Sequence, residues 1–304
     1  MALLFAEAKD LTVPDLVMGI ATEIFTKNPL MQIIPWAGTD GASYDYNREA
    51  TNPTAAFVAD DGALTSGALL MTRKTAAIKA LYVQNDISGM AQSLVRQQDP
   101  KSVLLLKMAK SLSEKIKNAS ILGAGTGSEF AGLEYICSDS DTSRNNLAST
   151  AAAGAAISFT LLRTLLDEVH GATAILANSR TIRSIKSLYD ALGGTVPTLI
   201  MSGGYRAIEF EGVPILPVDA IPIDDTLTGG DTGTAVYAIR TNPQPGLEDD
   251  GVSFIYANKY PLGFKALDLG ALEAKDNDRM RLMQYMAMVT HSTLAVGSLN
   301  LINN

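Results

Sequence analysis

The clearest alternation of apolar and polar positions runs from Asp99 to Ser120 and predicts one long amphipathic helix. Asp99 can cap its first turn, Pro100 is tolerated where a backbone N–H would have no partner, and Gly123 or Gly125 can end it. At about 1.5 Å per residue, these roughly 22 residues reach about 33 Å, which suits a strut laid against a sheet. The apolar face repeats at three- and four-residue spacing and comprises Leu105, Met108, Ala109, Leu112, Ile116 and Ala119.

A second pattern, with a period of two, begins at Ser43 and predicts a long β-hairpin that extends to Val83. Tyr44 and Tyr46 alternate with polar residues, and the returning segment is rich in residues that favour strands. The tip, residues 50–67, is rich in Ala, Gly, Asp and Thr and offers too little apolar surface for a core of its own. Because an isolated two-stranded ribbon is only marginally stable in water, we expect this hairpin to lie on a neighbouring chain.

Shorter periodic segments surround these two elements. Residues Met1 to Pro35 form an arm in which Val13 to Phe25 has helical spacing. After a polar loop, the pattern predicts a mixed sheet with two flanking helices. The expected helices are Ser158–His170 and Arg180–Leu192, and the expected strands are Ala174–Ala177, Thr198–Met201, Arg206–Phe210, Val213–Val218 and Ala235–Arg240. Three later strands are expected at Val252–Ala257, Arg279–Val289 and Thr293–Ile302.

Composition narrows the class of protein. The 304 residues are 47% apolar and 18% charged, which supports a well-buried interior, and no run is long and apolar enough to predict a membrane span. Met1 to Asp10 lacks the basic start of a signal peptide, so we expect assembly in the cytoplasm. The single cysteine, Cys137, excludes an internal disulfide framework and a thiolate metal cage. A net charge of −8 argues against tight sequence-specific binding of nucleic acid but allows its loose enclosure.

The glycine-rich segment Gly123–Gly127, GAGTG, resembles part of a dinucleotide-binding fingerprint, but its neighbours come in the wrong order. That motif needs a strand before it and a helix after it, whereas here the predicted helix comes first. We therefore interpret the segment as the stop and turn of the long helix. The alternative is a small-molecule enzyme that uses this turn and the mixed sheet, and it predicts nucleotide binding that Gly125→Val abolishes.

The two histidines, His170 and His291, favour structural roles. Neither has another histidine or a cysteine at metal-ligand spacing, and His170 is placed where a cation stabilises the end of a helix. The sequence also lacks a G-x-S-x-G nucleophile elbow, which argues against a serine hydrolase.

Two groups of acidic residues have plain interpretations as well. Asp224, Asp225 and Asp231 lack the twelve-residue calcium pattern and are expected in a solvated loop. The pair Asp60 and Asp61, at the hairpin tip, is suited to a turn or an intersubunit salt bridge rather than to acid–base catalysis. We therefore predict no catalytic residues, no metal and no cofactor.

In their order and spacing, several segments resemble the major capsid proteins of tailed bacteriophages with the Hong Kong 97 fold, from about Trp36 to the end of the chain. They are the tyrosine strand with the loop Phe57–Gly62, the strand to Val83, the long helix, ILGAGTG with Gly132–Leu133, ILANSRTIRSIKSLYDALGG, and EGVPILPVDAIP at Glu211–Pro222.

The resemblance implies an α+β subunit in four parts. They are an N-terminal arm (residues 1–42), an extended hairpin loop (43–83), a peripheral domain with the long helix as its spine (84–129 and 258–304), and an axial domain of mixed sheet and helices (130–257). The last strands would rejoin the peripheral sheet. The residues expected to form assembly contacts are Tyr44, Tyr46, Arg48, Phe57, Asp60, Asp61, Arg73, Lys74 and Lys79.

The function that the resemblance implies is structural: hexamers and pentamers of this chain would form an icosahedral shell. The shell would enclose double-stranded DNA and contact it only loosely. Scaffolding, portal and decoration proteins would be its partners, and no membrane would be involved. The recognisable body begins within about forty residues of Met1, which favours a separate scaffolding protein or none over a long cleaved scaffold region. Lys74 and Lys79 lie in the ribbon where some relatives carry an intersubunit crosslink, but no asparagine partner is evident. The alternative is an encapsulin, a compartment of the same fold that encloses cargo enzymes.

Overall fold

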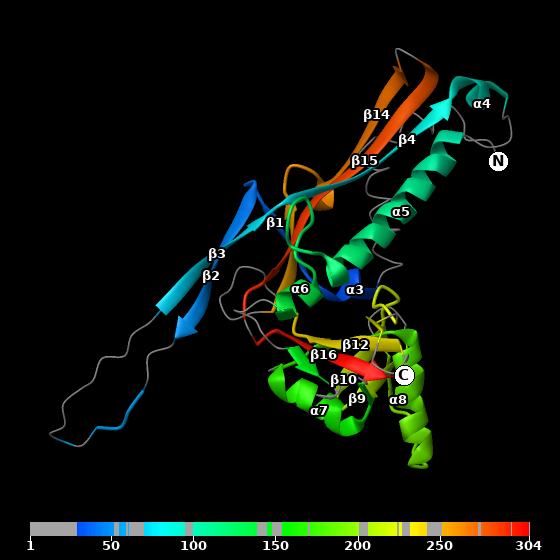
Figure 1. Cartoon of the computed structure of the whole chain (residues 1–304). Coiled ribbons are helices and arrows are strands. Elements are labelled where there is room, and N and C mark those ends of the chain that lie inside the picture. Colours follow the sequence, from blue (N-terminus) through cyan, green and yellow to red (C-terminus); the bar gives the residue numbers. More distant parts are fainter. Residues whose placement is uncertain are drawn as a thin grey trace.

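The computed structural model describes residues 29–51, 55–58, 60, 70–94, 100–138, 145–147, 154–169, 171–200, 206–223, 225–226, 232–241, 251–272, 275–292 and 294–303. They form two sheets, one long helix and a projecting two-stranded ribbon (Figure 1). The expected arm helix, Val13 to Phe25, lies outside the described residues. The first described element is a short helix, α3 (Pro29–Ile33), whose Leu30 and Met31 are buried in the main core.

The first sheet is organised around one long strand, β15 (Lys275–Thr290). One edge of β15 pairs antiparallel with β4 (Lys79–Ser88), and the other pairs in turn with β14 (Phe264–Leu272) and β13 (Val252–Ala257). β1 (Trp36–Thr39) then adds parallel to β13. At roughly 3.3 Å per residue, the 16 residues of β15 extend about 50 Å. The sequence predicted most of β15, as Arg279–Val289, and missed β14, which follows a short 3₁₀ turn, η1 (Pro261–Gly263).

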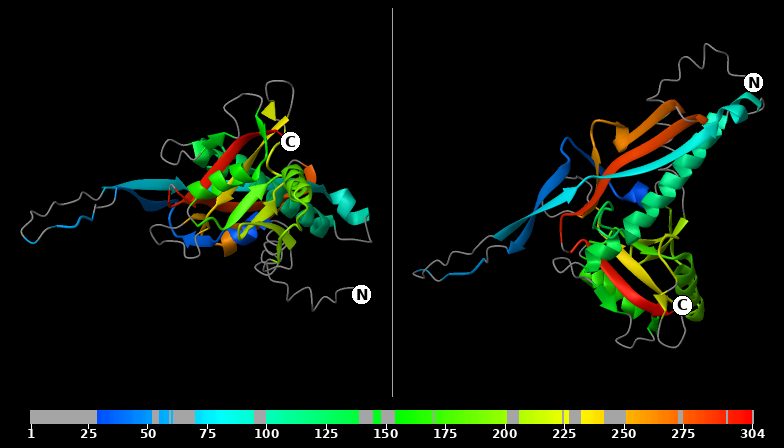
Figure 2. Two further views of the ribbon diagram at one scale, coloured as in Figure 1. Left: turned by 90° about the horizontal axis from the view of Figure 1, so that it is seen from below. Right: turned by 45° about the horizontal axis from the view of Figure 1, so that its top comes forward.

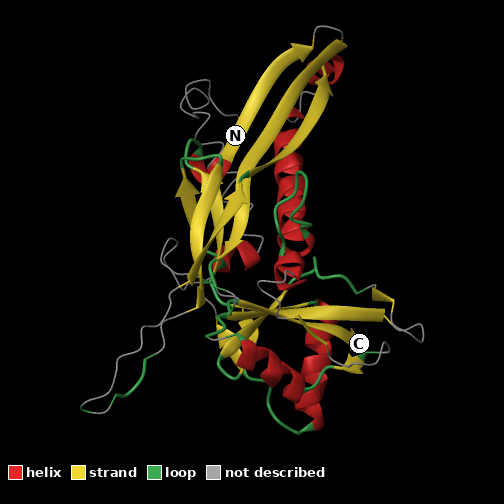
Figure 3. Ribbon diagram, turned by 60° about the vertical axis from the view of Figure 1, so that its left-hand side comes forward, coloured by secondary structure: helices red, strands yellow, loops and turns green. Residues whose placement is uncertain are grey.

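The predicted long helix is confirmed as α5 (Pro100–Leu122), which lies along β4 and β15 (Figure 3). The apolar stripe expected from the spacing is buried in the main core, and Leu112 and Ile116 are at most 2% exposed. The opposite face carries exposed Lys107 and Lys110. A shorter helix, α4 (Gly89–Leu94), precedes α5, and α6 (Leu133–Ser138) follows its glycine turn.

The second sheet is mixed and flanked by two helices, as the sequence predicted. Helix α7 (Phe159–Glu168) is capped by Ser158, and α8 (Ser179–Ala191) is capped by Asn178, whose side chain accepts a hydrogen bond from the Arg180 N–H at 3.0 Å. The strands run in the order β5 (Asn145–Leu147), β16 (Val296–Asn303), β12 (Thr232–Ile239), β7 (Ala174–Ala177), β10 (Val213–Pro217), β9 (Arg206–Phe210) and β8 (Thr198–Ile200). Two short strands, β6 (Ala155–Ala156) and β11 (Asp225–Thr226), pair with β16 and β12.

Two strands differ from the expected arrangement. The last strand, β16, was expected in the sheet of the long helix, and this is wrong: it pairs antiparallel with β12, with Val296 opposite Ile239. Conversely β13, expected in the axial part, pairs with β15 in the first sheet. The reason is that Leu299 and Ile302 of β16 complete the core under α7, a partnership that the alternating pattern of the strand does not encode.

Alternate residues of the second sheet belong to two different cores. Ile175 of β7 and Val236 of β12 pack with α7 and α8, whereas Leu176 and Tyr237, their neighbours in sequence, join the core of the first sheet and α5. The main core therefore lies between the two sheets, and the smaller one lies beneath the second sheet. No helix among the described residues is long and apolar enough to cross a membrane.

The predicted hairpin is formed by β2 (Ser43–Thr51) and β3 (Leu70–Ala77), which pair antiparallel from Ser43 opposite Ala77. Its expected extension to Val83 is wrong, because residues 79–83 belong to β4 and pair with β15 in the first sheet. We call this pair the ribbon; no other described strand joins it. The ribbon points away from both sheets, and the segment 55–58 lies at its far end (Figures 1 and 2). The single residue Ile78 separates β3 from β4, so the ribbon and the first sheet share one continuous stretch of chain.

Candidate functional site

The ribbon joins the body through a small aromatic cluster. The rings of Tyr44 and Tyr46, on the same face of β2, are stacked with centroids 6.0 Å apart. Both meet the ring of His291 edge-on, at 6.0 Å from Tyr44 and 5.1 Å from Tyr46. His291 is 5% exposed, and its Nε2 lies 3.3 Å from Oγ of Ser253. Partial burial raises the pKa of the Tyr44 hydroxyl. The cluster therefore fixes the base of the ribbon to the ends of β13 and β15.

On the opposite face of the ribbon, polar groups connect its two strands. The Asp45 carboxylate accepts hydrogen bonds from the hydroxyl of Thr75, at 2.6 Å, and from the guanidinium of Arg73. These two bonds, that from Thr75 first, hold the pKa of Asp45 below its ordinary value. Asp45 and Thr75 are directly opposite in the register, so these polar contacts hold the pairing of β2 with β3 in place.

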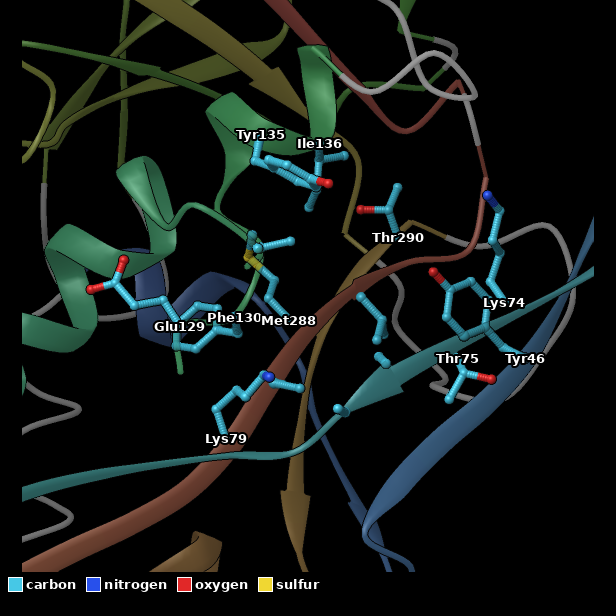
Figure 4. Close-up of a pocket in the computed structure, with 16 residues that line it drawn as sticks. Tyr46, Lys74, Thr75, Lys79, Glu129, Phe130, Tyr135, Ile136, Met288 and Thr290 are labelled. Atoms are coloured by element: carbon cyan, nitrogen blue, oxygen red, sulfur yellow. The ribbon is translucent and has the colours of Figure 1, made fainter. Parts of the chain in front are cut away.

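A cavity of about 290 Å³ lies where the ribbon meets the body, and we call it the groove (Figure 4). Its ribbon side carries Tyr46 and Lys74, and its opposite side carries Phe130 and Tyr135. The rings of Tyr46 and Tyr135 enter the space from opposite sides in Figure 4. Its floor comes from the end of β15, and the full lining is Tyr46, Lys74, Thr75, Ala76, Ala77, Lys79, Gly125, Glu129, Phe130, Ala131, Tyr135, Ile136, Ala287, Met288, Val289 and Thr290.

The turn that ends α5 forms one wall of the groove. Gly123 donates to the carbonyl of Ala119 at 2.9 Å and accepts from the N–H of Gly132 at 2.8 Å. A Cβ on Gly123 would lie 2.4 Å from the carbonyl oxygens of Ala119 and Phe130, so the chain here packs backbone against backbone. The interpretation of GAGTG as a helix stop and turn is confirmed, because α5 ends at Leu122 and no helix follows the motif directly.

Two lysines tie this turn to its surroundings. Lys79, at the start of β4, donates from Nζ to the carbonyl of Gly127 at 2.7 Å. Lys115 of α5 pairs with Glu129 at 2.8 Å, and this hydrogen bond holds the pKa of Glu129 below its ordinary value. Glu129 is thus already neutralised where it lines the groove.

The predicted assembly residues fall into two locations. Tyr44, Tyr46, Lys74 and Lys79 lie at the base of the ribbon, with Tyr46 and both lysines in the groove lining. Phe57 and Asp60 lie in the tip, and both are exposed. Of the others, Arg73 pairs with Asp45, Arg48 occupies a backbone position opposite Thr72 in the ribbon, and Asp61 lies outside the described residues. Their role as assembly contacts stays a prediction.

The other candidate residues have structural surroundings. Burial raises the pKa of the Cys137 thiol to about 12, so it stays protonated and unreactive near neutral pH. Asp225 is in β11, whereas Asp224, Asp231 and His170 lie outside the described residues. Within the described part of the chain, no group of three or more His, Cys, Asp or Glu side chains could hold a metal ion.

From the sequence, two residues that shape this region, Phe130 and Tyr135, were not identified, and His291 was assigned a structural role without its partners. Phe130 lies in the loop that follows the glycine turn, and Tyr135 lies on α6, a six-residue helix too short to give a periodic signal. His291 stood alone in the sequence, and its contacts arise only because the ribbon returns to the end of β15. An aromatic residue next to a glycine turn was the only available sign.

Comparison with known proteins gives one family and a consistent set of folds. A model of the phage capsid family matches residues 9–272. Among curated proteins, none matches the sequence significantly. The chain is similar to the holo-SrpI encapsulin complex from Synechococcus elongatus PCC 7942, with a TM-score of 0.72, 17% identity, and coverage of 100% of this chain and 97% of that one.

Two further solved structures are similar, one the capsid of a GTA particle and one from a phage. The empty GTA particle has a TM-score of 0.66 and 17% identity, over 90% of this chain and 95% of that one. The structure from Microbacterium phage Oxtober96 has a TM-score of 0.63 and 13% identity, over 91% of each chain. At these identities the structural likeness shows the fold.

Proposed function

The chain belongs to the phage capsid family as a major capsid protein, and from this premise we propose that its copies assemble as hexamers and pentamers into an icosahedral shell around double-stranded DNA. The observation that carries the proposal is the ribbon, whose strands pair with no other described strand and whose described tip residues are all exposed. A lone two-stranded ribbon is marginal in water, so a neighbouring subunit is its natural support. A closed symmetric shell supplies that neighbour to every copy.

The expected parts serve this proposal with changed boundaries. The extended loop is the ribbon of β2 and β3, whereas residues 79–83 lie in β4 and residues 36–39 lie in β1, both in the first sheet. The peripheral part holds α5 and the first sheet, including β13, and the axial part holds the second sheet with α7 and α8, including β16. We place the axial part at the symmetry axes of the hexamers and pentamers, where its edge strand β8 carries exposed Leu199 and Ile200.

The remaining roles follow from the same assignment. A chain with a net charge of −8 would hold packaged DNA only loosely, since tight binding needs clustered basic residues. We propose scaffolding, portal and decoration proteins as further partners, assembly in the host cytoplasm before release as part of the virion, and no catalytic role.

Electron microscopy of purified native protein tests the proposal. Closed particles with five-fold vertices are the expected result. A monodisperse monomer at every concentration and salt condition, with no particles in the images, would refute it.

An encapsulin shell is the second candidate, because the encapsulin match covers the whole chain at a TM-score of 0.72. The two candidates differ in what the shell contains. Particles purified from the native source should contain DNA protected from nuclease if the shell is a capsid, and a single abundant protein cargo if it is a compartment. Absorbance at 260 and 280 nm together with mass spectrometry of the contents separates the two.

A further inference from the structure

The face of the first sheet that lies opposite α5 carries partly exposed side chains. On the α5 side, Leu282 is buried in the main core and Leu81 packs against it (Figure 3). Successive residues of a strand point to opposite faces, so Tyr82 and Met283 point away from α5. Tyr82 is 65% exposed and Met283 is half-buried. We call this surface the open face, and its centre consists of two rows in register across β4, β15 and β14: Tyr82, Met283 and Lys265, then Gln84, Arg281 and Leu267.

Three carboxylates of these strands are paired away from the centre of the open face. Asp268 and Asp278 form ion pairs with Lys101 of α5, at 3.2 and 2.8 Å, so they are directed to the opposite face of the sheet. Asp86 lies on the open face, but its carboxylate is paired with the guanidinium of Arg279 at 2.7 Å. None of the three therefore neutralises a positive charge at the centre.

The cations near the centre of the open face have neutral partners. The guanidinium of Arg281 donates to the amide oxygen of Gln84, at 2.6 and 2.9 Å. The ammonium groups of Lys265 and Lys259 lie 5.2 and 5.9 Å from the ring centroid of Tyr260. A cation–π contact holds an ammonium in place without cancelling its charge. Among the described residues, none of these three cations forms an ion pair with a carboxylate.

The shape and composition of the open face suit a protein partner. Three strands about 4.8 Å apart, with about six residues of each, give a surface of roughly 300 Å². A standard interface buries about 800 Å² per partner, so the open face forms the centre of a contact. Aromatic residues, Met and Arg are enriched at interfaces, and here they are Tyr82, Met283 and Arg281. Nucleobase stacking is disfavoured, because the ring of Tyr260 is already stacked on that of Tyr285, with centroids 6.1 Å apart.

The charge of the open face selects the kind of partner. A symmetric contact between two copies would place this face against itself and bring Lys265 and Arg281 of both copies together. Like charges that oppose each other weaken an interface, so the complementary surface carries carboxylates. A partner that fits therefore has acidic side chains around at least one apolar side chain.

We propose that the open face binds an acidic segment of a protein other than this chain, with an apolar side chain of that segment on Met283 and its carboxylates beside Lys259, Lys265 and Arg281. The inference rests on the proposed shell function, and the partner is an accessory protein of the shell.

Zero-length crosslinking of native particles tests this proposal. A water-soluble carbodiimide joins a lysine amine to a carboxylate only where the two are in contact, and mass spectrometry of tryptic peptides identifies both. We expect Lys259 and Lys265 to be linked to Asp or Glu residues of a different protein. Lys107 and Lys110, on the exposed face of α5, are the control and should not be linked to that protein.

Two results would overturn the inference and leave the shell function intact. One is that Lys259 and Lys265 are linked only to peptides of this chain, because the open face is then covered by the chain itself or by another copy. The other is that well-formed particles give no links from these lysines. If no particles exist, the proposed function fails first and the inference falls with it.

Rebinding measures the contribution of individual side chains. Closed particles assembled from the purified chain are mixed with the protein that the crosslinks identify, and the dissociation constant is measured. Lys265→Glu should raise the dissociation constant by roughly tenfold, because it places a carboxylate opposite a carboxylate. Lys107→Glu makes the same change in net charge on α5 and should have little effect. Equal losses for these two variants would show a non-specific electrostatic attraction and would refute the pairing.

Two uncharged or conservative changes complete the series. Met283→Ala removes the apolar contact without changing the charge and should weaken binding, whereas Lys265→Arg should keep it. Each variant is compared only as closed particles, so that a defect in folding or assembly is recognised before binding is measured. Unchanged binding of both Met283→Ala and Lys265→Glu would place the partner elsewhere on the subunit.

Discussion

Substitution of Gly123 by alanine tests the close backbone packing at the end of α5, and Gly127→Ala in the same turn is its matched control. Gly123 is crowded: an added Cβ would lie 2.4 Å from two carbonyl oxygens, both backbone atoms that cannot swing aside. Gly127 is the reverse case, since a Cβ there meets nothing within 4 Å but the residue has a φ of +63°. The pair separates a steric cost from a conformational one.

The two costs can be estimated from general magnitudes. Forcing a methyl group into packed surroundings costs about 1–3 kcal/mol. At Gly123 the displaced carbonyl of Ala119 also accepts the Gly123 N–H, and losing that buried bond costs about 1–3 kcal/mol more. We therefore expect about 2–6 kcal/mol of destabilisation for Gly123→Ala. Gly127→Ala should cost about 1 kcal/mol, because the left-handed conformation costs an L-residue about 1–2 kcal/mol and the stiffer unfolded chain offsets part of it.

Urea unfolding of unassembled subunits, followed by fluorescence of the only tryptophan, measures both variants. Trp36 lies 4.7 Å from Phe254 between ring centroids and packs against the core that also contains Phe130. Unassembled subunits are needed because assembly adds its own stabilisation by mass action. Equal stability of the two variants, or a smaller loss for Gly123→Ala, would refute the packing argument.

Three further predictions concern the helix, the outer end of the first sheet and the base of the ribbon. Leu112→Ala, at a position 2% exposed, should cost about 2–5 kcal/mol in urea unfolding, whereas Leu106→Ala on the same helix, 60% exposed, should stay within about 0.5 kcal/mol. Hydrogen bonds, from Lys101 first, lower the pKa of Asp278, so this contribution is present above the ordinary aspartate pKa and is lost as the pH falls through the lowered value. Thermal stability should therefore fall below about pH 4, and Lys101→Met should weaken that dependence. His291→Ala should speed hydrogen exchange of the backbone amides of the ribbon while those of α5 keep their rates.

The sequence predicted those elements whose partners are local or whose pattern is long. The helical spacing of apolar residues in α5, α7 and α8 was sufficient, because a helix makes its hydrogen bonds within itself. The ribbon was predictable for a related reason, since its two strands are adjacent in the chain and pair with each other.

The sheet membership of β13 and β16 could not be predicted in the same way. Both are apolar strands, and either sheet would bury them. The sheet to which β16 belongs depends on the short connection after Thr290, through which the chain passes from β15 into the second sheet. Alternation specifies which residues of a strand face inward, but not which strand lies beside it.

The groove was only half predictable for a similar reason. Tyr46, Lys74 and Lys79 were selected because they belong to the ribbon, which the pattern revealed. Phe130 and Tyr135 reach the same cavity through the turn after α5, whose course depends on the close approach of Gly123 and Gly132. Backbone contacts of that kind leave no periodic signal in the sequence.

The way the ribbon is attached allows it to rotate about its base. Its strands are connected to the first sheet through Ile78 on one side and through residues 40–42 on the other, and the aromatic cluster around His291 holds them at one angle. The paired part is about 30 Å long at roughly 3.3 Å per residue, so a rotation of about 10° at its base moves its far end by roughly 5 Å. Both cores can stay unchanged during such a rotation, because neither contains a ribbon residue. One rigid subunit can therefore meet neighbours at different inclinations by changing only the packing of three rings.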